Sequence, residues 1–144
     1  GDGRMDVLTL SSAEVRVSLA QSSGGFGPST FIAARPPAGW NFAGAGDVNG
    51  DGKADVIWHN VNSGELYYWL MVSNTIIGGQ GGSYLPIGST VLGVGDYSGD
   101  GRTDVMSLAG GNVNVSIMQP SGLFAGIAFA GARPAGSYVF APVP

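Results

Sequence analysis

Short runs in which apolar and polar residues alternate recur along the chain, separated by turns rich in glycine, asparagine and proline. The alternation is clearest in NVNVSIM at 112–118, and EVRVSLA at 14–20 repeats it. Successive side chains of a strand point to opposite faces, so such runs indicate strands with two unlike faces. No stretch shows the period of about 3.6 residues that an amphipathic helix requires. The pattern predicts an all-β protein.

The middle of the chain shows the expected strands most clearly. A first strand is predicted at 40–46, a second at 54–60 and a third at 65–72, with the turn sequence NSG at 62–64 before the third. A weaker fourth strand is predicted around 75–79. Short consecutive strands joined by tight turns pair as an antiparallel sheet. Each unit of the chain is therefore expected to form one four-stranded sheet.

The chain repeats itself at an interval of 49 residues. Asp2, Asp51 and Asp100 are separated by this interval, and the two alternating runs lie two intervals apart. Four antiparallel strands in about 40–50 residues are typical of one β-propeller blade. We expect residues 1–144 to form a single propeller segment of three blades, with units at about 1–46, 47–95 and 96–144.

The last segment of the chain matches the first strand of a blade. Tyr138 and Phe140, in the segment at about 138–143, fall two intervals after Trp40 and Phe42. The first unit begins at its second strand, so this segment is the strand that the first unit lacks. Three blades are too few to close a propeller ring readily. We expect the ring to be completed by association or by blades missing from this chain.

Two apolar rows also favour association. They are the equivalent runs Val15, Val17, Leu19 and Val113, Val115, Ile117. In an open row of three blades one of them should face water, and such a patch marks an interface. We predict a homo-oligomer, with two copies making a six-blade ring, or an assembly with the remaining blades of a longer parent chain. The alternative is that loops or terminal segments cover the row.

Charged residues are scarce, and the acidic ones are concentrated. They make up 11% of the 144 residues, and every aspartate falls in a cluster at 2–6, 47–55 or 96–104. No basic patch accompanies the net charge of −4, so nucleic acid is excluded as a partner. No apolar run approaches the roughly 20 residues of a membrane span. The absence of cysteine excludes thiolate metal sites.

The middle cluster predicts a metal site. Asp47, Asn49, Asp51 and Asp55 occupy positions 1, 3, 5 and 9 of the loop, with the main-chain carbonyl of Lys53 at position 7. Carboxylates this close repel one another unless a cation neutralises them. Hard oxygen donors suit Ca²⁺, whereas Mg²⁺ demands a tighter octahedron and softer metals favour histidine or cysteine. We predict Ca²⁺ as the cofactor, against the alternative of a solvated turn.

The other two clusters repeat this pattern in part. The EF-hand is excluded, because its position 12 is a glutamate and here position 12 is Trp58. The third cluster is complete, with Ser98 in place of asparagine, and the first retains only its second half. The donors predicted in the third are Asp96, Ser98, Asp100, the Arg102 carbonyl and Asp104; those left in the first, which we expect to be empty or weakly occupied, are Asp2, the Arg4 carbonyl and Asp6.

The middle unit carries aromatic residues at positions where the other two units do not. By the 49-residue interval, Tyr67 and Trp69 correspond to serine and alanine in the first unit and to serine and methionine in the third. These rings either pack between sheets or line a groove that stacks on a sugar ring. The candidate ligand-binding residues are Trp40, Trp58, His59, Tyr67, Trp69 and Tyr84.

Catalysis has little support in the sequence. His59 is the only histidine, and a Ser-His-Asp set would have to borrow a predicted calcium ligand. Glu14 and Glu65, the only glutamates, are expected on different blades. We predict that the chain is not an enzyme.

The segment GDVNGDGKADV at 46–56 and its continuation VIWHNVNSGELYYWLM resemble the FG-GAP/VCBS-type repeat, in its bacterial branch. The resemblance implies the β-propeller of integrin α heads and of certain fungal and bacterial lectins. It also implies Ca²⁺ in the hairpin between the first two strands of a blade, and a secreted or cell-surface location. The three-unit length, the shortened first loop and Ser98 depart from the family pattern.

Two function classes follow from these features. The first is carbohydrate (lectin-like) recognition, with a glycan as the partner. The second is a protein-protein interaction or adhesion module, or a structural accessory domain of a larger secreted protein. The aromatic residues of the middle unit favour the first.

Overall fold

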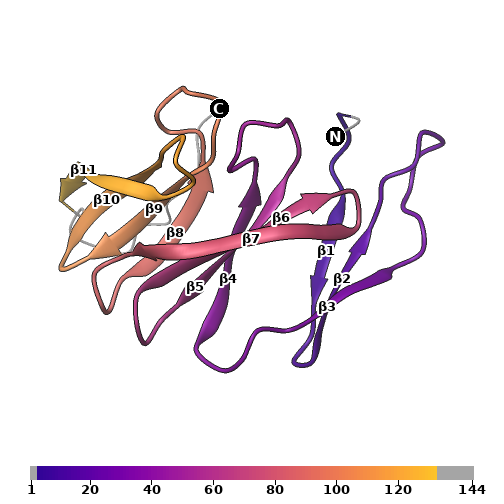
Figure 1. Cartoon of the computed structure of the whole chain (residues 1–144), viewed down its shortest axis with the longest axis horizontal. Helices are drawn as coiled ribbons and strands as arrows, with labels where there is room; N and C mark the ends of the chain where they lie inside the picture. Colours follow the sequence, from indigo (N-terminus) through magenta and orange to yellow (C-terminus); the bar gives the residue numbers. More distant parts are fainter. Residues whose placement is uncertain (1–2, 133–144) are drawn as a thin grey trace.

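The computed structural model describes residues 3–132, which contain eleven strands and no helix. The strands form three antiparallel sheets that follow one another along the chain and stand side by side in an open row (Figure 1). This arrangement confirms the predicted all-β fold with blade-like repeats. Residues 138–143, predicted as a strand, lie outside the described residues.

The first sheet, blade 1, has three strands and the other two have four. Blade 1 consists of β1 (Val7–Leu10), β2 (Glu14–Ser18) and β3 (Thr30–Ala34). Blade 2 consists of β4 (Trp40–Gly46), β5 (Asp55–Asn60), β6 (Glu65–Val72) and β7 (Thr75–Tyr84). Blade 3 consists of β8 (Thr90–Gly95), β9 (Asp104–Ala109), β10 (Asn112–Met118) and β11 (Phe124–Ala132). Blade 1 therefore has no counterpart of β4 and β8 among the described residues.

The fourth strand of blade 2 is longer than predicted, because it continues through the glycine-rich segment to Tyr84. Glycine weakens a strand unless a neighbour must approach closely. Here the ring of Tyr67 lies against β7. A Cβ on Gly79 would stand 2.9 Å from the Tyr67 hydroxyl, and a Cβ on Gly81 would stand 2.9 Å from the Tyr67 ring. The glycines make room for this ring.

The hairpin between the second and third strands is two residues longer in blade 2. His59 pairs with Leu66, seven positions on, whereas Leu10 pairs with Val15, five positions on. The predicted correspondence of the third strands is therefore wrong by two residues. By strand pairing, Tyr67 matches Arg16 and Asn114, and Trp69 matches Ser18 and Ser116. Blade 2 remains the aromatic one.

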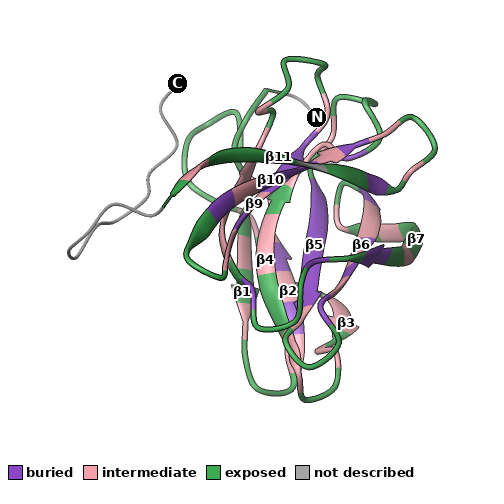
Figure 2. Cartoon of the chain, turned by 90° about the vertical axis from the view of Figure 1, so that its left-hand side faces the viewer, coloured by how far each residue is buried: buried purple, intermediate pink, exposed green. Residues whose placement is uncertain are grey.

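The core lies between the blades, and β5 contributes to both sides of it. Val56 and Trp58 pack toward blade 1 with Val15 and Met71. Ile57 packs toward blade 3 with a cluster that includes Val105 and Met118. Figure 2 shows β5 as buried along most of its length. Blade 2 therefore lies between blades 1 and 3, and successive side chains of β5 point alternately toward one and the other.

Blades 2 and 3 approach most closely through β4 and the start of blade 3. A Cβ on Gly44 would overlap the side chain of Val94, and one on Gly46 would overlap Thr103. The Thr103 N–H also donates to the Asp47 carbonyl at 2.6 Å. Because glycine has no side chain, these two positions allow the sheets of blades 2 and 3 to pack closely against each other.

The prediction that an apolar row faces water is wrong for the valines. Val15 is fully buried and Val17 is 7% exposed, because their row packs against blade 2. Val113 and Val115 are 6% and 7% exposed. The burial of these valines removes the exposed-row argument for association.

Candidate functional site

The two complete corner loops share the hydrogen bonds of the aspartate at position 1. The loop at 47–55 joins β4 to β5, and the loop at 96–104 joins β8 to β9. The Asp47 carboxylate accepts hydrogen bonds from the N–H groups of Gly50, Asp51 and Gly52 at 2.7, 3.1 and 2.6 Å. The Asp96 carboxylate accepts the equivalent bonds from Gly99, Asp100 and Gly101 at 2.7, 3.0 and 2.9 Å. These N–H groups, that of Gly101 above all, hold the pKa of Asp96 below its ordinary value.

The aspartate at position 5 of each loop is paired with the basic residue at position 7. The Lys53 ammonium lies 3.0 Å from the Asp51 carboxylate, and the Arg102 guanidinium pairs with Asp100. The hydrogen bond from Lys53 lowers the pKa of Asp51. The protein therefore supplies a cation of its own beside one carboxylate of each loop.

The aspartate at position 9 has a structural role that the sequence did not reveal. Asp55 and Asp104 are fully buried, and burial raises the pKa of Asp55. One oxygen accepts from the start of the loop and the other from the end of the third strand. The donors are Val48 N–H (3.1 Å) and Met71 N–H (2.8 Å) for Asp55, and Ser98 N–H and Met118 N–H (both 2.9 Å) for Asp104. Asp6 accepts the matching bond from Ala20 N–H at 2.9 Å.

The oxygen chemistry of the loops suits Ca²⁺, but the carboxylates do not converge. A carboxylate has about four acceptor positions, so Asp47 keeps capacity for a cation beyond its three N–H partners. Within residues 3–132, however, no three His, Cys, Asp or Glu side chains are grouped as a metal site requires. In both loops, a bound cation would share the position-5 aspartate with the basic residue at position 7. In the first loop, Arg4 and Asp6 are described and Asp2 is not.

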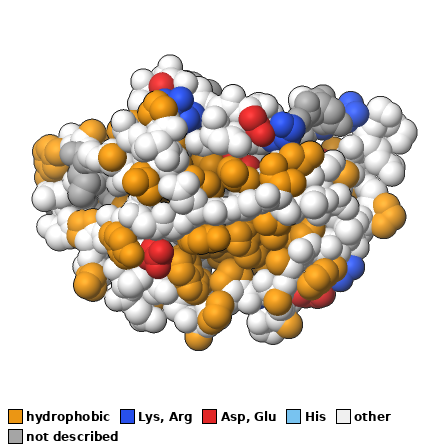
Figure 3. Space-filling view, in the orientation of Figure 1, with side chains coloured by type: hydrophobic (Ala, Val, Ile, Leu, Met, Phe, Trp, Pro, Cys, Tyr) orange, Lys and Arg blue, Asp and Glu red, His pale blue; other side chains and the backbone are white. Residues whose placement is uncertain are grey.

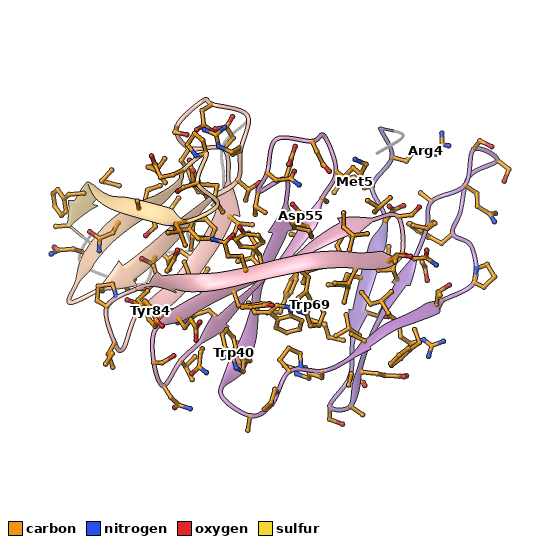
Figure 4. All side chains as sticks on the ribbon, viewed as in Figure 1. Arg4, Met5, Trp40, Asp55, Trp69 and Tyr84 are labelled. Atoms are coloured by element: carbon orange, nitrogen blue, oxygen red, sulfur yellow. The ribbon has the colours of Figure 1, made fainter. Side chains whose placement is uncertain are left out.

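Four of the six predicted ligand residues come together in one pocket. The aromatic pocket is lined by Trp40 from β4, Trp58 from β5, Tyr67 and Trp69 from β6, and Pro36 and Pro37 from the segment that leads into β4. Its volume is about 300 Å³. Figure 3 shows a hydrophobic patch beneath the band of β7, and Figure 4 places Trp69 and Trp40 there, with Asp55 on the other side of β7. The pocket is thus at the end of the blade away from the corner loop.

The rings of this pocket meet edge to face. The centroids of Trp58 and Trp69 are 5.0 Å apart at 61°, and those of Trp40 and Tyr67 are 6.2 Å apart at 78°. Trp58 is 1% exposed, so the packing interpretation holds for this residue. Trp40, Tyr67 and Trp69 are only half-buried. The buried Trp58 indole N–H has no hydrogen-bond partner.

The remaining two predicted ligand residues are elsewhere, so their grouping with the pocket is wrong. Tyr84 is 62% exposed at the end of β7 (Figure 4). His59 follows Trp58 on β5, so its side chain points to the opposite face. There it is 4% exposed and lines a separate cavity of about 250 Å³. Burial lowers the pKa of His59.

Comparison with known proteins identifies one family. The profile of the FG-GAP-like repeat matches residues 1–58 and again residues 47–107. No curated protein matches the chain. Nowhere in residues 3–132 is there a helix long and apolar enough to cross a membrane.

Proposed function

Because the chain belongs to the FG-GAP-like repeat family, we propose that it is a non-catalytic, calcium-binding β-propeller module that recognises carbohydrate, in a secreted or cell-surface protein. The convergence of Trp40, Tyr67 and Trp69 over a buried Trp58 is the observation that carries this proposal. Within residues 3–132, blades 1 and 3 have no aromatic residue at the positions of Trp58, Tyr67 and Trp69.

An aromatic pocket of this kind suits the apolar face of a sugar ring. The C–H groups of a pyranose pack on half-buried rings, while its hydroxyl groups stay near water or find fixed polar atoms. The aromatic residues that line the pocket carry three indole N–H groups (Trp40, Trp58 and Trp69) and the Tyr67 hydroxyl, and the Trp58 N–H has no partner. A volume of about 300 Å³ lies at the lower end of small-molecule sites. The proposed ligand is therefore one sugar unit within the pocket.

Calcium has a structural role in this proposal. Two ions in the loops at 47–55 and 96–104 would add four positive charges, which equals the net charge of −4 in magnitude. Sites of this kind in extracellular modules bind Ca²⁺ at about 10⁻⁴–10⁻³ M. The ions would hold the corners of blades 2 and 3, away from the aromatic pocket. We also propose that the chain self-associates, which its mass in solution would test.

A glycan array tests the carbohydrate proposal. The wild type is expected to bind a restricted set of glycans, and Trp69→Ala to lose that binding, because it removes a pocket wall. Tyr84→Ala is the matched control, since it removes an exposed aromatic residue outside the pocket. Repeating the array with a chelator reports whether recognition needs calcium. Uniformly flat signals from the wild type would contradict carbohydrate recognition and favour the protein-interaction alternative, in which an apolar side chain enters the pocket.

A further inference from the structure

The cavity beside His59 is distinct from the aromatic pocket. The His59 cavity lies between blades 2 and 3, and its lining includes Asn41, Phe42, His59, Val61, Ser89 and Thr90. None of the residues that line it is acidic or basic apart from His59 itself. Asn41 pairs with His59 across β4 and β5, so both side chains start from the same face of blade 2.

His59 is an unexplained polar group in this position. Its Nε2 atom is buried and has no hydrogen-bond partner. A buried polar group without a hydrogen-bond partner destabilises the folded chain. The matching residues of blades 1 and 3 are Leu10 and Leu108, as the strand pairing confirms. The fold therefore accepts leucine here, and packing alone does not require an imidazole.

The chemistry of the cavity selects a neutral ligand that both donates and accepts hydrogen bonds. Burial disfavours the imidazolium form of His59, and the cavity offers no other charge for an anion or cation. The neutral imidazole of His59, the Asn41 amide and the Thr90 hydroxyl each donate and accept, whereas the Ser89 hydroxyl already donates to the Pro86 carbonyl and keeps only acceptor capacity. Hydroxyl groups of a polyol or saccharide match this set.

The two pockets begin at adjacent residues of the same strands. Trp40 precedes Asn41 on β4, and Trp58 precedes His59 on β5, so the members of each pair point to opposite faces of blade 2. Both pairs lie at the end of blade 2 where β4 begins and β5 ends, so a ligand that reaches both faces must pass around this end of the sheet and be longer than one sugar ring. Resting on the proposed function, we propose that the His59 cavity is a second saccharide subsite, which binds hydroxyl groups of an oligosaccharide whose neighbouring unit stacks in the aromatic pocket.

The test uses the full chain and saccharides of one to four units, built from glucose, mannose, galactose or N-acetylglucosamine. For the sugar that binds most tightly, the affinity is expected to rise as the saccharide lengthens from one unit to three. His59→Leu, the residue of the sister blades, should weaken trisaccharide binding about tenfold, the loss of one or two hydrogen bonds. It should leave monosaccharide binding unchanged. His59→Gln, which keeps a donor and an acceptor, should recover part of the loss.

A second readout follows the imidazole directly. His59 is the only histidine, so its ring protons give a single set of NMR signals. These signals should shift with the trisaccharide and not with the monosaccharide. Trisaccharide binding that Trp69→Ala abolishes, but that His59→Leu leaves intact with unmoved imidazole signals, would overturn the second subsite alone. Failure of the wild type to bind any glycan, including longer ones on the array, would overturn both the subsite and the proposed function.

Discussion

Asp55 and His59 are buried polar residues of the same strand with opposite hydrogen-bonding states. Both oxygens of Asp55 accept backbone N–H groups, so its burial is compensated. The Nε2 atom of His59 has no partner, and its counterparts in the other blades are leucines. At the scale of single residues, the hydrogen bonds of Asp55 therefore compensate for its burial, whereas the burial of His59 without a partner for Nε2 costs stability.

The burial of His59 predicts a pH dependence of stability. Its pKa in the folded chain lies below the ordinary value of 6.5, so the unfolded chain binds more protons as the pH falls through this region. Stability should be full above about pH 6.5 and decline as the pH falls toward the folded-state pKa. We expect the free energy of unfolding, measured by urea denaturation, to fall between about pH 7.5 and 5.5.

His59→Leu is the control for this titration. Leucine carries no proton, so the variant should show little change over the same pH range and should be more stable than the wild type at its lower end. An equal decline in both proteins would assign the pH dependence to another group.

The aspartate at position 9 connects the β4–β5 hairpin and the β8–β9 hairpin to the third strand of their blades by a hydrogen bond. Asp55 connects to β6 through Met71, and Asp104 connects to β10 through Met118. Asp6 makes the same connection in blade 1, where it accepts from the Ala20 N–H. At the scale of the element, the position-9 bond therefore recurs in all three blades.

Removing the position-9 carboxylate should destabilise the protein even without calcium. Asp104→Ala leaves the buried Met118 N–H without an acceptor, at a cost of about 1–3 kcal/mol, and also removes the acceptor of the part-buried Ser98 N–H. Asp100→Ala is the matched control in the same loop, because it loses an ion pair with Arg102, typically about 0–1 kcal/mol at a surface, and one exposed hydrogen bond from the Arg102 N–H. Urea denaturation with a chelator present measures both. Equal losses in the two variants would contradict the structural role of Asp104.

Calcium should stabilise the corner loops in a saturable way. We expect the melting temperature of the wild type to rise with Ca²⁺ and to return when a chelator is added, because an ion bound only by the folded chain shifts the unfolding equilibrium. Asp51→Ala and Asp100→Ala together should reduce the rise. A melting temperature that does not respond to millimolar Ca²⁺ would refute the calcium proposal.

The three blades form one molecule because their sheets stack face to face, with blade 2 in the middle. The stacking depends on small residues where the sheets are closest, at Gly44 and Gly46. Large aromatic residues instead lie where blade 2 meets blade 1, and they leave the aromatic pocket between them. At the scale of the whole molecule, residue size thus sets where the blades touch and where the aromatic pocket opens.

Enlarging the closest contact should separate blades 2 and 3. Gly44→Ala would drive a methyl group into Val94, a stiff β-branched side chain, and overpacking of this kind costs about 1–3 kcal/mol. Gly78→Ala is the control, since its methyl group would meet only Leu70 at 3.7 Å, an ordinary contact distance. Thermal unfolding of the two variants is the measurement. An undiminished melting temperature for Gly44→Ala would show that the blades separate without cost.

The sequence by itself determined the features that depend on nearby residues. The alternation in β2 and β10 identified strands, and the repeat identified blades, because strand faces follow from a period of two. The corner loop at 47–55 was also predictable, since Asp47 bonds to N–H groups only three to five positions away. The aromatic character of blade 2 was visible in the same way.

Tertiary structure alone decided which residues meet across strands and blades. The bond from Asp55 to Met71 spans 16 positions, and the two-residue shift of β6 depends on the length of its hairpin. Neither the gathering of Trp40, Tyr67 and Trp69 nor the separation of His59 from them can be read from spacing. Burial and partners depend on contacts between distant segments, which a local pattern does not specify. The two candidate subsites of blade 2 therefore emerged only from the packed sheets.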